Sequence, residues 1–362
     1  MPANRPADGV PARTNGMKSN IELRSDNAAG AAPEIMSAIA SANTGSALAY
    51  GADDWTAELR DKVREVFEHP DAEVFPVVSG TAANSLALSA LCPPWGAVLC
   101  HETAHILQSE CGATSMFGGG AVMRGVGGEN FRVTPHTLRH AFDTTRWGDP
   151  HHSQPSVLSL TVPTDHGTLY TVAQVAEVAA IARERGLRAH LDGARVANAV
   201  AALGCSPAEL TWRAGIDALS LGAMKNGALS TDAIVCFDPA ISEQLVYRVK
   251  RSGHVASKMR FQSVQLTAYL TNDVWLHLAR HANEAMTRFA AGLRALDIEF
   301  LNSPDVNMLF ARVEPAVADR MADAGLLFYR MSADTVRLVT SFQTTDDEID
   351  EALSRIKSAL AG

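Results

Sequence analysis

Short apolar runs alternate with stretches of helical periodicity along most of the chain, and this alternation predicts the fold. Segments such as 85–91 and 172–186 carry the spacing of helices. The apolar runs between the helical stretches have the length of buried strands and are bounded by glycine, proline or polar residues, namely 72–78, 96–100, 121–126, 156–162, 187–192, 217–222 and 232–237. This rhythm is typical of an α/β protein with a mainly parallel sheet buried on both faces. Ligands of such sheets bind beyond the carboxyl ends of the strands.

The pattern changes in the last third of the chain. Residues 240–297 are helical without strong strand signals. Beyond them, strand-like and helix-like segments alternate, with strands expected at 298–303, 306–313 and 334–340 and helices at 316–325 and 346–360. We therefore predict a polar N-terminal extension over 1–20, a large domain over 21–265 and a smaller α+β domain over 266–362.

Composition narrows the class of protein. The net charge of −9 argues against a nucleic-acid partner, which would require a basic surface. No apolar run approaches the roughly 20 residues that span a bilayer, and the first 20 residues lack the apolar segment of a secretory signal. The five cysteines form no C-x-x-C pair, which fits reduced thiols. We expect a cytoplasmic enzyme without a membrane or nucleic-acid partner.

The segment "CHETAH" contains an H-E-x-x-H pattern in His101, Glu102 and His105, as in helical zinc sites. A zinc hydrolase needs both histidines on one helix and a third ligand downstream. Here His101 directly follows a strand run, and Gln108 stands where the extended motif has glycine. Zinc is therefore a distant alternative, and no metal site is predicted.

Polar groups follow several of the predicted strands. Ser79, Gly80 and Thr81 lie between a strand and a helix, where backbone N–H groups and hydroxyls form a phosphate cup or an ordinary capping turn. Asp192 leaves a buried strand, either as a helix cap or as a carboxylate that keeps a ring nitrogen protonated.

Two basic residues complete this set. Lys225 lies among small residues between two strand runs, either as a solvated side chain or as a desolvated amine able to form a Schiff base. Arg337 lies within an apolar strand, where it needs a structural ion-pair partner or a substrate carboxylate. A phosphate cup, a ring-nitrogen partner, a Schiff-base lysine and a carboxylate-binding arginine together indicate pyridoxal 5′-phosphate acting on an amino acid.

With these residues in place, the chain resembles the L-threonine aldolase family, a branch of the fold-type-I pyridoxal-phosphate enzymes. The resemblance extends from about Ile21 to Phe342 and rests on several motifs in one order: "ELRSDNAAGAAPEI", "YGADDWTAEL", "SGTAAN", "TAHI", "LDGARVANA", the Lys225 turn and "VRLVT". It implies a large domain like that of aspartate aminotransferase, and homotetramers built from dimers that share active sites.

The resemblance also implies a role for each matching residue. Lys225 would form the Schiff base, Asp192 would pair with the pyridine nitrogen, and His105 would stack on the ring. The remaining roles are phosphate binding by Ser79, Gly80 and Thr81, proximity of Arg195 to the phenolic oxygen and the substrate, carboxylate binding by Ser25 and Arg337, and contributions from a neighbouring subunit by Tyr50 and by Lys258 or Arg260.

One departure concerns the substrate hydroxyl. Many members carry a histidine where this chain has Asp165, with His166 beside it. The base for the hydroxyl proton is therefore open among His105, Asp165, His166 and a water molecule that they hold. The expected reaction is retro-aldol cleavage of L-threonine, L-allo-threonine and related β-hydroxy-α-amino acids, phenylserine included, to glycine and an aldehyde. A β-eliminating lyase or an aminotransferase is the alternative.

Overall fold

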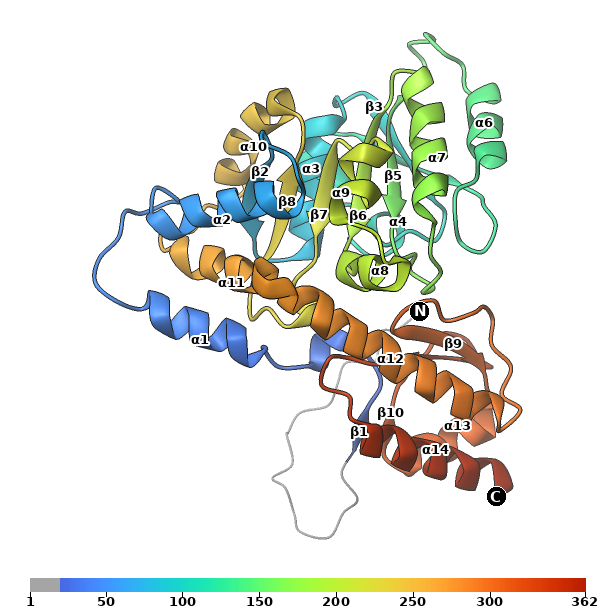
Figure 1. The fold of residues 1–362 in the computed structure, drawn as a ribbon. Coiled ribbons are helices and arrows are strands. Elements are labelled where there is room, and N and C mark those ends of the chain that lie inside the picture. The colour runs from blue at the N-terminus through green and yellow to red at the C-terminus, as the bar shows by residue number, and fades with distance from the viewer. Residues whose placement is uncertain (1–19) are drawn as a thin grey trace.

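A seven-stranded sheet forms the centre of the computed structural model, which describes residues 20–362 (Figure 1). Of the predicted extension over 1–20, all but residue 20 lies outside this range. The strand order is β2-β8-β7-β6-β5-β3-β4. The bounds are β2 Glu73–Val77, β3 Gly96–His101, β4 Val122–Val126, β5 Gln154–Thr161, β6 Arg188–Gly193, β7 Ala218–Leu221 and β8 Asp232–Cys236. Strand β8 runs antiparallel to β2 and β7, whereas the other neighbouring pairs are parallel, so the predicted mainly parallel sheet is confirmed.

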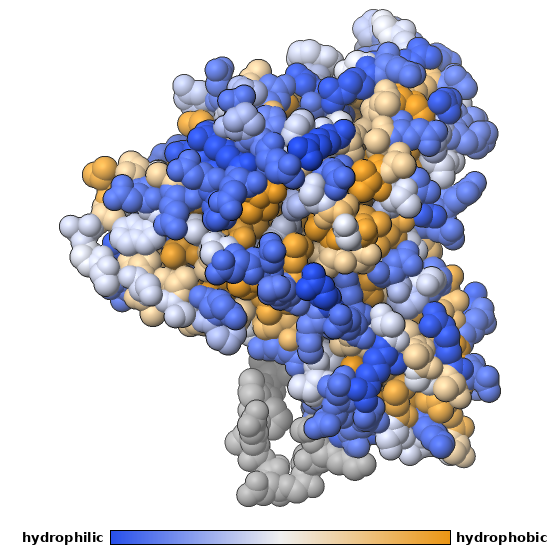
Figure 2. All heavy atoms as spheres, in the orientation of Figure 1, coloured by the Kyte–Doolittle hydropathy of each residue, from blue (hydrophilic) through white to orange (hydrophobic). Residues whose placement is uncertain are grey.

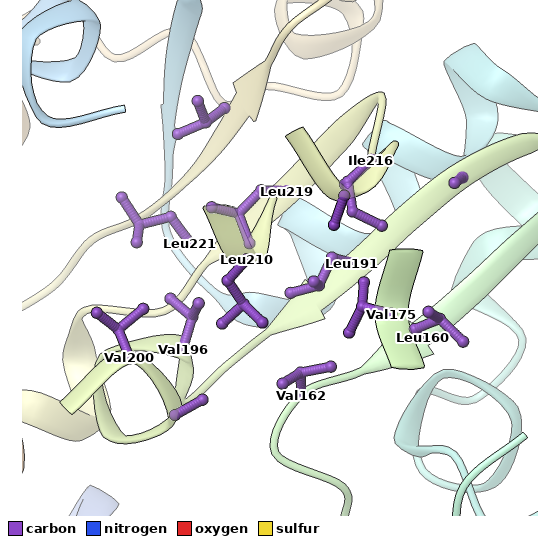
Figure 3. Packing of buried hydrophobic residues seen from close by; sticks show 14 of the residues in the cluster. Leu160, Val162, Val175, Leu191, Val196, Val200, Leu210, Ile216, Leu219 and Leu221 are labelled. Atoms are coloured by element: carbon purple, nitrogen blue, oxygen red, sulfur yellow. The ribbon is translucent and has the colours of Figure 1, made fainter. Parts of the chain in front are cut away.

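Successive residues of the strands pack into different cores because side chains alternate between the two faces of a sheet. In β3, Val98 and Cys100 belong to the core formed with α3 and α10, whereas Leu99 belongs to the larger core on the opposite face. Figure 3 shows part of the larger core, where Leu191 and Leu219 face side chains of the covering helices. Burial of both faces explains why the strands form short, almost continuous apolar runs in the sequence.

Helices cover the two faces. The core with Val98 is closed by α3 (Gly80–Leu91) and α10 (Pro239–Arg251). The larger core includes side chains of α1 (Pro33–Ala42), α2 (Asp54–Val66), α6 (Pro135–Asp143), α7 (Val172–Glu184), α8 (Val196–Leu203), α9 (Pro207–Leu210) and α11 (Arg260–Leu270). Two short helices, α4 (His105–Gln108) and α5 (Ala113–Phe117), follow β3.

A second, smaller core lies in the C-terminal part of the chain. The antiparallel sheet β11-β12-β9 packs with α13 and α14, and the N-terminal β1 pairs in parallel with β10. The bounds are β1 Ile21–Glu22, β9 Met308–Arg312, β10 Leu326–Leu327, β11 Tyr329–Arg330, β12 Thr335–Val339, α13 Pro315–Asp323 and α14 Asp346–Ala361. Helix α12 (Val274–Arg294) extends from one core to the other, with Trp275 in the first and Phe289 in the second (Figure 1). The domain division at residue 265 stays a prediction; this position lies inside α11.

The strand expected at 298–303 is not a strand. Phe300 forms a single bridge with Ala311, and the side-chain amide of Asn302 then donates to the carbonyl of His166 at 3.0 Å. This turn of the chain, followed by Pro304, ends the pairing with β9 after one bridge.

Polar residues cover most of the face drawn in Figure 2, and apolar residues are visible in patches between them. Within residues 20–362, no helix combines the length and the apolar character needed to cross a bilayer.

Candidate active site

A cavity of about 390 Å³ lies at the carboxyl ends of the parallel strands. It is bounded by the turns that follow β2, β3, β5, β6 and β7, and by residues of the C-terminal sheet and of the segment after β1. The predicted site residues that line it are Ser25, Ser79, Gly80, Thr81, His105, Asp165, Asp192, Arg195, Lys225 and Arg337. The structure thus brings together ten residues predicted from distant parts of the sequence.

The first turn of α3 forms one end of the cavity. Ser79 is the N-cap residue, and its hydroxyl accepts a hydrogen bond from the backbone N–H of Ala82 at 3.2 Å. Gly80 and Thr81 follow in the first turn and line the cavity. Because the first N–H groups of a helix have no partner within the helix and lie at the positive end of its dipole, this end of the cavity suits an anion such as a phosphate.

Lys225 lies on the turn between β7 and β8, which is fixed from several sides. The carboxylate of Asp232 accepts the backbone N–H groups of Ala223 and Met224 at 2.7 and 3.0 Å. The side-chain amide of Asn226 donates to the hydroxyl of Tyr269 at 2.9 Å. Burial lowers the pKa of Lys225, and the nearby guanidinium of Arg195 adds to this effect. The turn therefore holds an amine whose neutral, nucleophilic form is favoured.

His105 and Asp192 belong to one chain of hydrogen bonds. Nδ1 of His105 lies 2.9 Å from Oε1 of Glu110, and Nδ2 of Asn84 donates to the same oxygen at 2.9 Å. Nδ2 of Asn84 also donates to Oδ2 of buried Asp192 at 3.1 Å, while Oδ1 of Asp192 accepts the N–H of Ala194 at 3.1 Å. The hydrogen bond to Glu110 raises the pKa of His105. Glu110 and Asn84 were not predicted from the sequence.

Asp165 lies against the start of α4. Its Oδ2 accepts the backbone N–H of His105 at 2.9 Å, and the side chain lines the cavity. Burial raises the pKa of Asp165 to about 6, and the negative charge of Asp192 adds to this rise. A carboxyl group with such a pKa can exchange a proton near neutral pH.

His166, the neighbour of Asp165, does not line this cavity. Its ring is stacked on Phe131, with 3.6 Å between centroids, and lies 4.7 Å from the ring of Phe310. Burial lowers its pKa to about 4, and His101 contributes. Because His166 packs against these rings and does not line the cavity, it is a weaker candidate than His105 and Asp165 for the base that removes the hydroxyl proton.

The H-E-x-x-H pattern does not have the arrangement of a helical zinc site. His101 ends β3 and its Nδ1 is 2.8 Å from the hydroxyl of Thr103, whereas His105 begins α4. The two histidines therefore do not share a helix face. Within residues 20–362, no three His, Cys, Asp or Glu side chains are grouped to hold a metal ion.

Arg195 is neutralised by a residue that the sequence analysis did not single out. Its Nε and Nη2 donate to the two oxygens of Asp26 at 2.6 and 2.8 Å. Although burial favours the neutral acid, the charge and hydrogen bonds of Arg195 hold the pKa of Asp26 below its ordinary value. The amide of Asn307 also donates to Asp26, at 3.1 Å. Asp26 belongs to the "RSD" segment quoted above, and its place beside Ser25 was the available signal.

Arg337 reaches the cavity from β12. Its Nη2 donates to the carbonyl of Arg24 at 3.1 Å, and its guanidinium lies 5.0 Å from the centre of the Tyr329 ring. Its Nε is buried and has no hydrogen-bond partner. Within residues 20–362, no carboxylate pairs with it, so the structural salt bridge considered from the sequence is absent there. The guanidinium lines the cavity and can therefore serve a carboxylate that enters it.

Three predicted residues lie outside the cavity of the single chain. Tyr50 lines a separate pocket of about 650 Å³ and lies under Lys250, whose Nζ is 4.5 Å from the ring centre. Nη1 of Arg260 donates to the carbonyl of Thr44 at 3.3 Å. Lys258, two residues earlier, is likewise not part of the cavity wall. Their predicted action from a neighbouring subunit stays a prediction.

Comparisons with known proteins agree with this geometry. The family model described as β-eliminating lyase matches residues 22–316. A low specificity L-threonine aldolase of a Pseudomonas species is 36% identical over 344 residues, covering 94% of this chain and 98% of that relative. The protein of the same name from Pseudomonas aeruginosa is 37% identical over 340 residues, covering 93% and 97%.

Solved structures show the same fold. The threonine aldolase of Leishmania major has a TM-score of 0.87 at 24% identity and covers 93% of this chain and 98% of its own. A mutant aspartate aminotransferase of Thermus thermophilus has a TM-score of 0.68 at 16% identity, with 98% and 100% covered. The fold predicted from the resemblance is thereby confirmed. The chain belongs to the β-eliminating lyase family and, within it, to the group of the low-specificity L-threonine aldolases.

Proposed function

We propose that the protein is a pyridoxal-phosphate-dependent aldehyde-lyase that cleaves L-threonine, L-allo-threonine and related β-hydroxy-α-amino acids to glycine and an aldehyde. The observation that carries this proposal is the meeting of Lys225, Asp192, Arg337 and the start of α3 around one cavity. Each of these groups has an ordinary structural explanation alone. Their convergence on one cavity has no such structural explanation, and it suits the binding of a cofactor together with a small amino acid.

The cavity fits pyridoxal phosphate. The first turn of α3, with Ser79, Gly80 and Thr81, would hold the phosphate, and the buried carboxylate of Asp192 would face the ring nitrogen. Lys225 would bond to the cofactor and His105 would lie against its ring. When bound, the cofactor supplies a ring that takes up the electron pair released as a bond to Cα breaks.

The residues of the chain then orient the substrate and move its protons. The guanidinium of Arg337 would donate to the substrate carboxylate, with Ser25 also in the cavity wall. This contact would fix the rotation about the bond between Cα and the amino nitrogen of the substrate. That rotation decides which of the other bonds to Cα is aligned for cleavage. Asp165 and His105 both line the cavity and are the candidates for removing the hydroxyl proton, either directly or through a water molecule.

The test is product analysis. Purified protein is incubated with L-threonine and L-allo-threonine, and acetaldehyde and glycine are measured together with ammonia and keto acids. Aldehyde and glycine in equal amounts are expected. The alternatives use the same electron sink. A β-eliminating lyase predicts ammonia and a keto acid, and an aminotransferase predicts a keto acid without ammonia once a second keto acid is added to accept the amino group. Absence of an aldehyde from every β-hydroxy-α-amino acid tried, phenylserine included, would reject the proposal.

Replacing Arg337 with alanine is expected to raise KM for L-threonine by about 10- to 100-fold, because a charged, two-pronged contact to the carboxylate is lost. Steady-state kinetics measure this effect. The matched control is Arg312→Ala, since Arg312 lies on the neighbouring strand β9 and pairs with Glu299 and Asp334 at the surface. An unchanged KM in Arg337→Ala would show that the carboxylate binds elsewhere.

The pH dependence of kcat/KM is expected to reflect the protonation of the Asp165 carboxyl group. As a base it must be ionised, so kcat/KM is expected to fall as the pH drops below about 6, where this carboxyl gains its proton. In Asp165→Asn, the activity should be lower throughout and this acid limb should disappear. If the variant keeps the wild-type limb, the limb belongs to another group, and His105 becomes the remaining candidate.

We also infer a homotetramer in the cytoplasm, built from dimers in which Tyr50 and one of Lys258 and Arg260 complete the neighbouring site. The exposure of Tyr50, 58% of its surface, supports a role at an interface. All five cysteines are free, in keeping with a reducing compartment. Light scattering that gave a monomer at full activity would contradict the shared site.

A further inference from the structure

A buried carboxylate that the proposed mechanism does not use lies directly behind His105. The side chain of Glu110 has no exposed surface, yet it belongs to the wall of the cavity. Its Oε1 is shared by Nδ1 of His105 and Nδ2 of Asn84, both at 2.9 Å. Through Asn84, Glu110 is connected to Asp192 on the neighbouring part of the wall.

The hydrogen bonds of Asn84 determine where the protons of this chain lie. Its Nδ2 carries two hydrogens and contacts two carboxylate oxygens, one of Glu110 and one of Asp192. The reversed amide would place its oxygen against both carboxylate oxygens, which is unfavourable. Both carboxylates therefore act as acceptors, and Nδ1 of His105 must be the donor to Glu110. Neutral His105 then carries its hydrogen on Nδ1 and a lone pair on Nε2.

We infer that Glu110, joined to Asp192 through Asn84, is a positioning residue that holds the proton of His105 on Nδ1 and leaves Nε2 as the accepting nitrogen. This inference deepens the proposed function, on which its catalytic meaning rests. A ring held in this way keeps one orientation against the cofactor and presents an acceptor rather than a donor to a proton in the cavity.

Two unpaired atoms favour this function over a purely structural role. Oε2 of Glu110 and Oδ1 of Asn84 are both buried and have no hydrogen-bond partner. A polar network that served stability alone would pair these acceptors or be replaced by apolar side chains. The chain instead retains a buried carboxyl group whose one hydrogen-bonded oxygen is the oxygen that contacts His105.

The test is NMR of protein labelled with ¹⁵N-histidine, in the cofactor-loaded form in which it is purified. Two-bond nitrogen–proton correlations distinguish the two neutral tautomers, and the His105 signal is assigned by its absence in His105→Asn. The wild type should show the Nδ1–H tautomer. In Glu110→Gln the charge is lost, so the titration midpoint of His105 should fall by about one pH unit and the tautomer should become mixed.

A second variant, Asn84→Ala, should shift the titration midpoint of His105 in the opposite direction. In Asn84→Ala, Glu110 loses its other donor and holds the proton of His105 more strongly, so the midpoint should rise. The matched control is Asp217→Asn, a buried carboxylate outside the cavity that accepts the N–H of Ala189 at 2.7 Å. It should lower the thermal stability and leave the His105 signal unchanged.

The two proposals fail separately. If Glu110→Gln and Asn84→Ala both keep the wild-type tautomer and midpoint while aldehyde is still released by the wild type, the positioning role is overturned and the proposed function stands. If the expected shifts appear but no aldehyde is formed from any substrate, the network is as inferred and the proposed reaction is wrong.

Discussion

Aldehyde release from L-threonine is expected to fall at least about 10³-fold when Lys225 is replaced by alanine, a change in activation free energy of about 4 kcal/mol or more. The turn around Lys225 is fixed by Asp232 and Asn226, and burial favours its neutral amine. No other lysine lines the cavity, as far as the chain is described between residues 20 and 362. No second lysine of this wall can therefore replace the lost amine.

Borohydride treatment identifies the lysine that is bonded to the cofactor, because reduction makes the bond permanent and the labelled peptide can then be mapped. The label is expected on Lys225. The control variant is Lys62→Ala, since Lys62 lies on α2 and pairs with Glu65 at 2.6 Å. It should keep both the label and the activity. A label on another lysine, or none, would remove the basis of the proposed mechanism.

The sequence was sufficient to predict the architecture because parallel strands buried on both faces leave short apolar runs. It was also sufficient to bring Lys225, Asp192 and His105 together, since the carboxyl ends of such strands lie along one edge of the sheet. The position of a residue along the chain and the topology of the fold are enough to predict that these three residues lie close together. The strand expected at 298–303 is absent because the chain turns away from β9 after the single bridge at Phe300, which the apolar run alone does not reveal.

Side-chain partners could not be predicted in the same way. The ion pair of Arg195 with Asp26 and the contact of Glu110 with His105 depend on rotamers and on the packing of separate elements. The stacking of His166 between two phenylalanine rings likewise depends on Phe310, which is far away in the sequence. Residues that contact a site residue through their side chains, as Asp26 and Glu110 do, can therefore be identified only from the structure. Residues that directly follow the strands of the sheet can be predicted from the sequence.

Asp192 is expected to influence kcat through the proton on the ring nitrogen of the cofactor, whereas Lys225 would act through its bond to the cofactor. In Asp192→Asn, kcat should fall about 10²- to 10³-fold, because a neutral amide cannot keep a proton on the ring nitrogen in a buried site. The substitution also replaces one acceptor by a donor. Either the N–H of Ala194 or the amide of Asn84 then faces another N–H group, and some stability is lost.

The two effects can be separated by measurement. Borohydride should still label Lys225 in Asp192→Asn, since the amine and the phosphate-binding turn of α3 are intact, so binding survives while turnover fails. Asp217→Asn again provides the comparison for loss of a buried carboxylate, because its partner N–H groups lie away from the cavity. If Asp192→Asn retained more than a tenth of the wild-type kcat, the carboxylate would be acting as a structural cap of the segment after β6. The electron sink would then depend on groups other than Asp192.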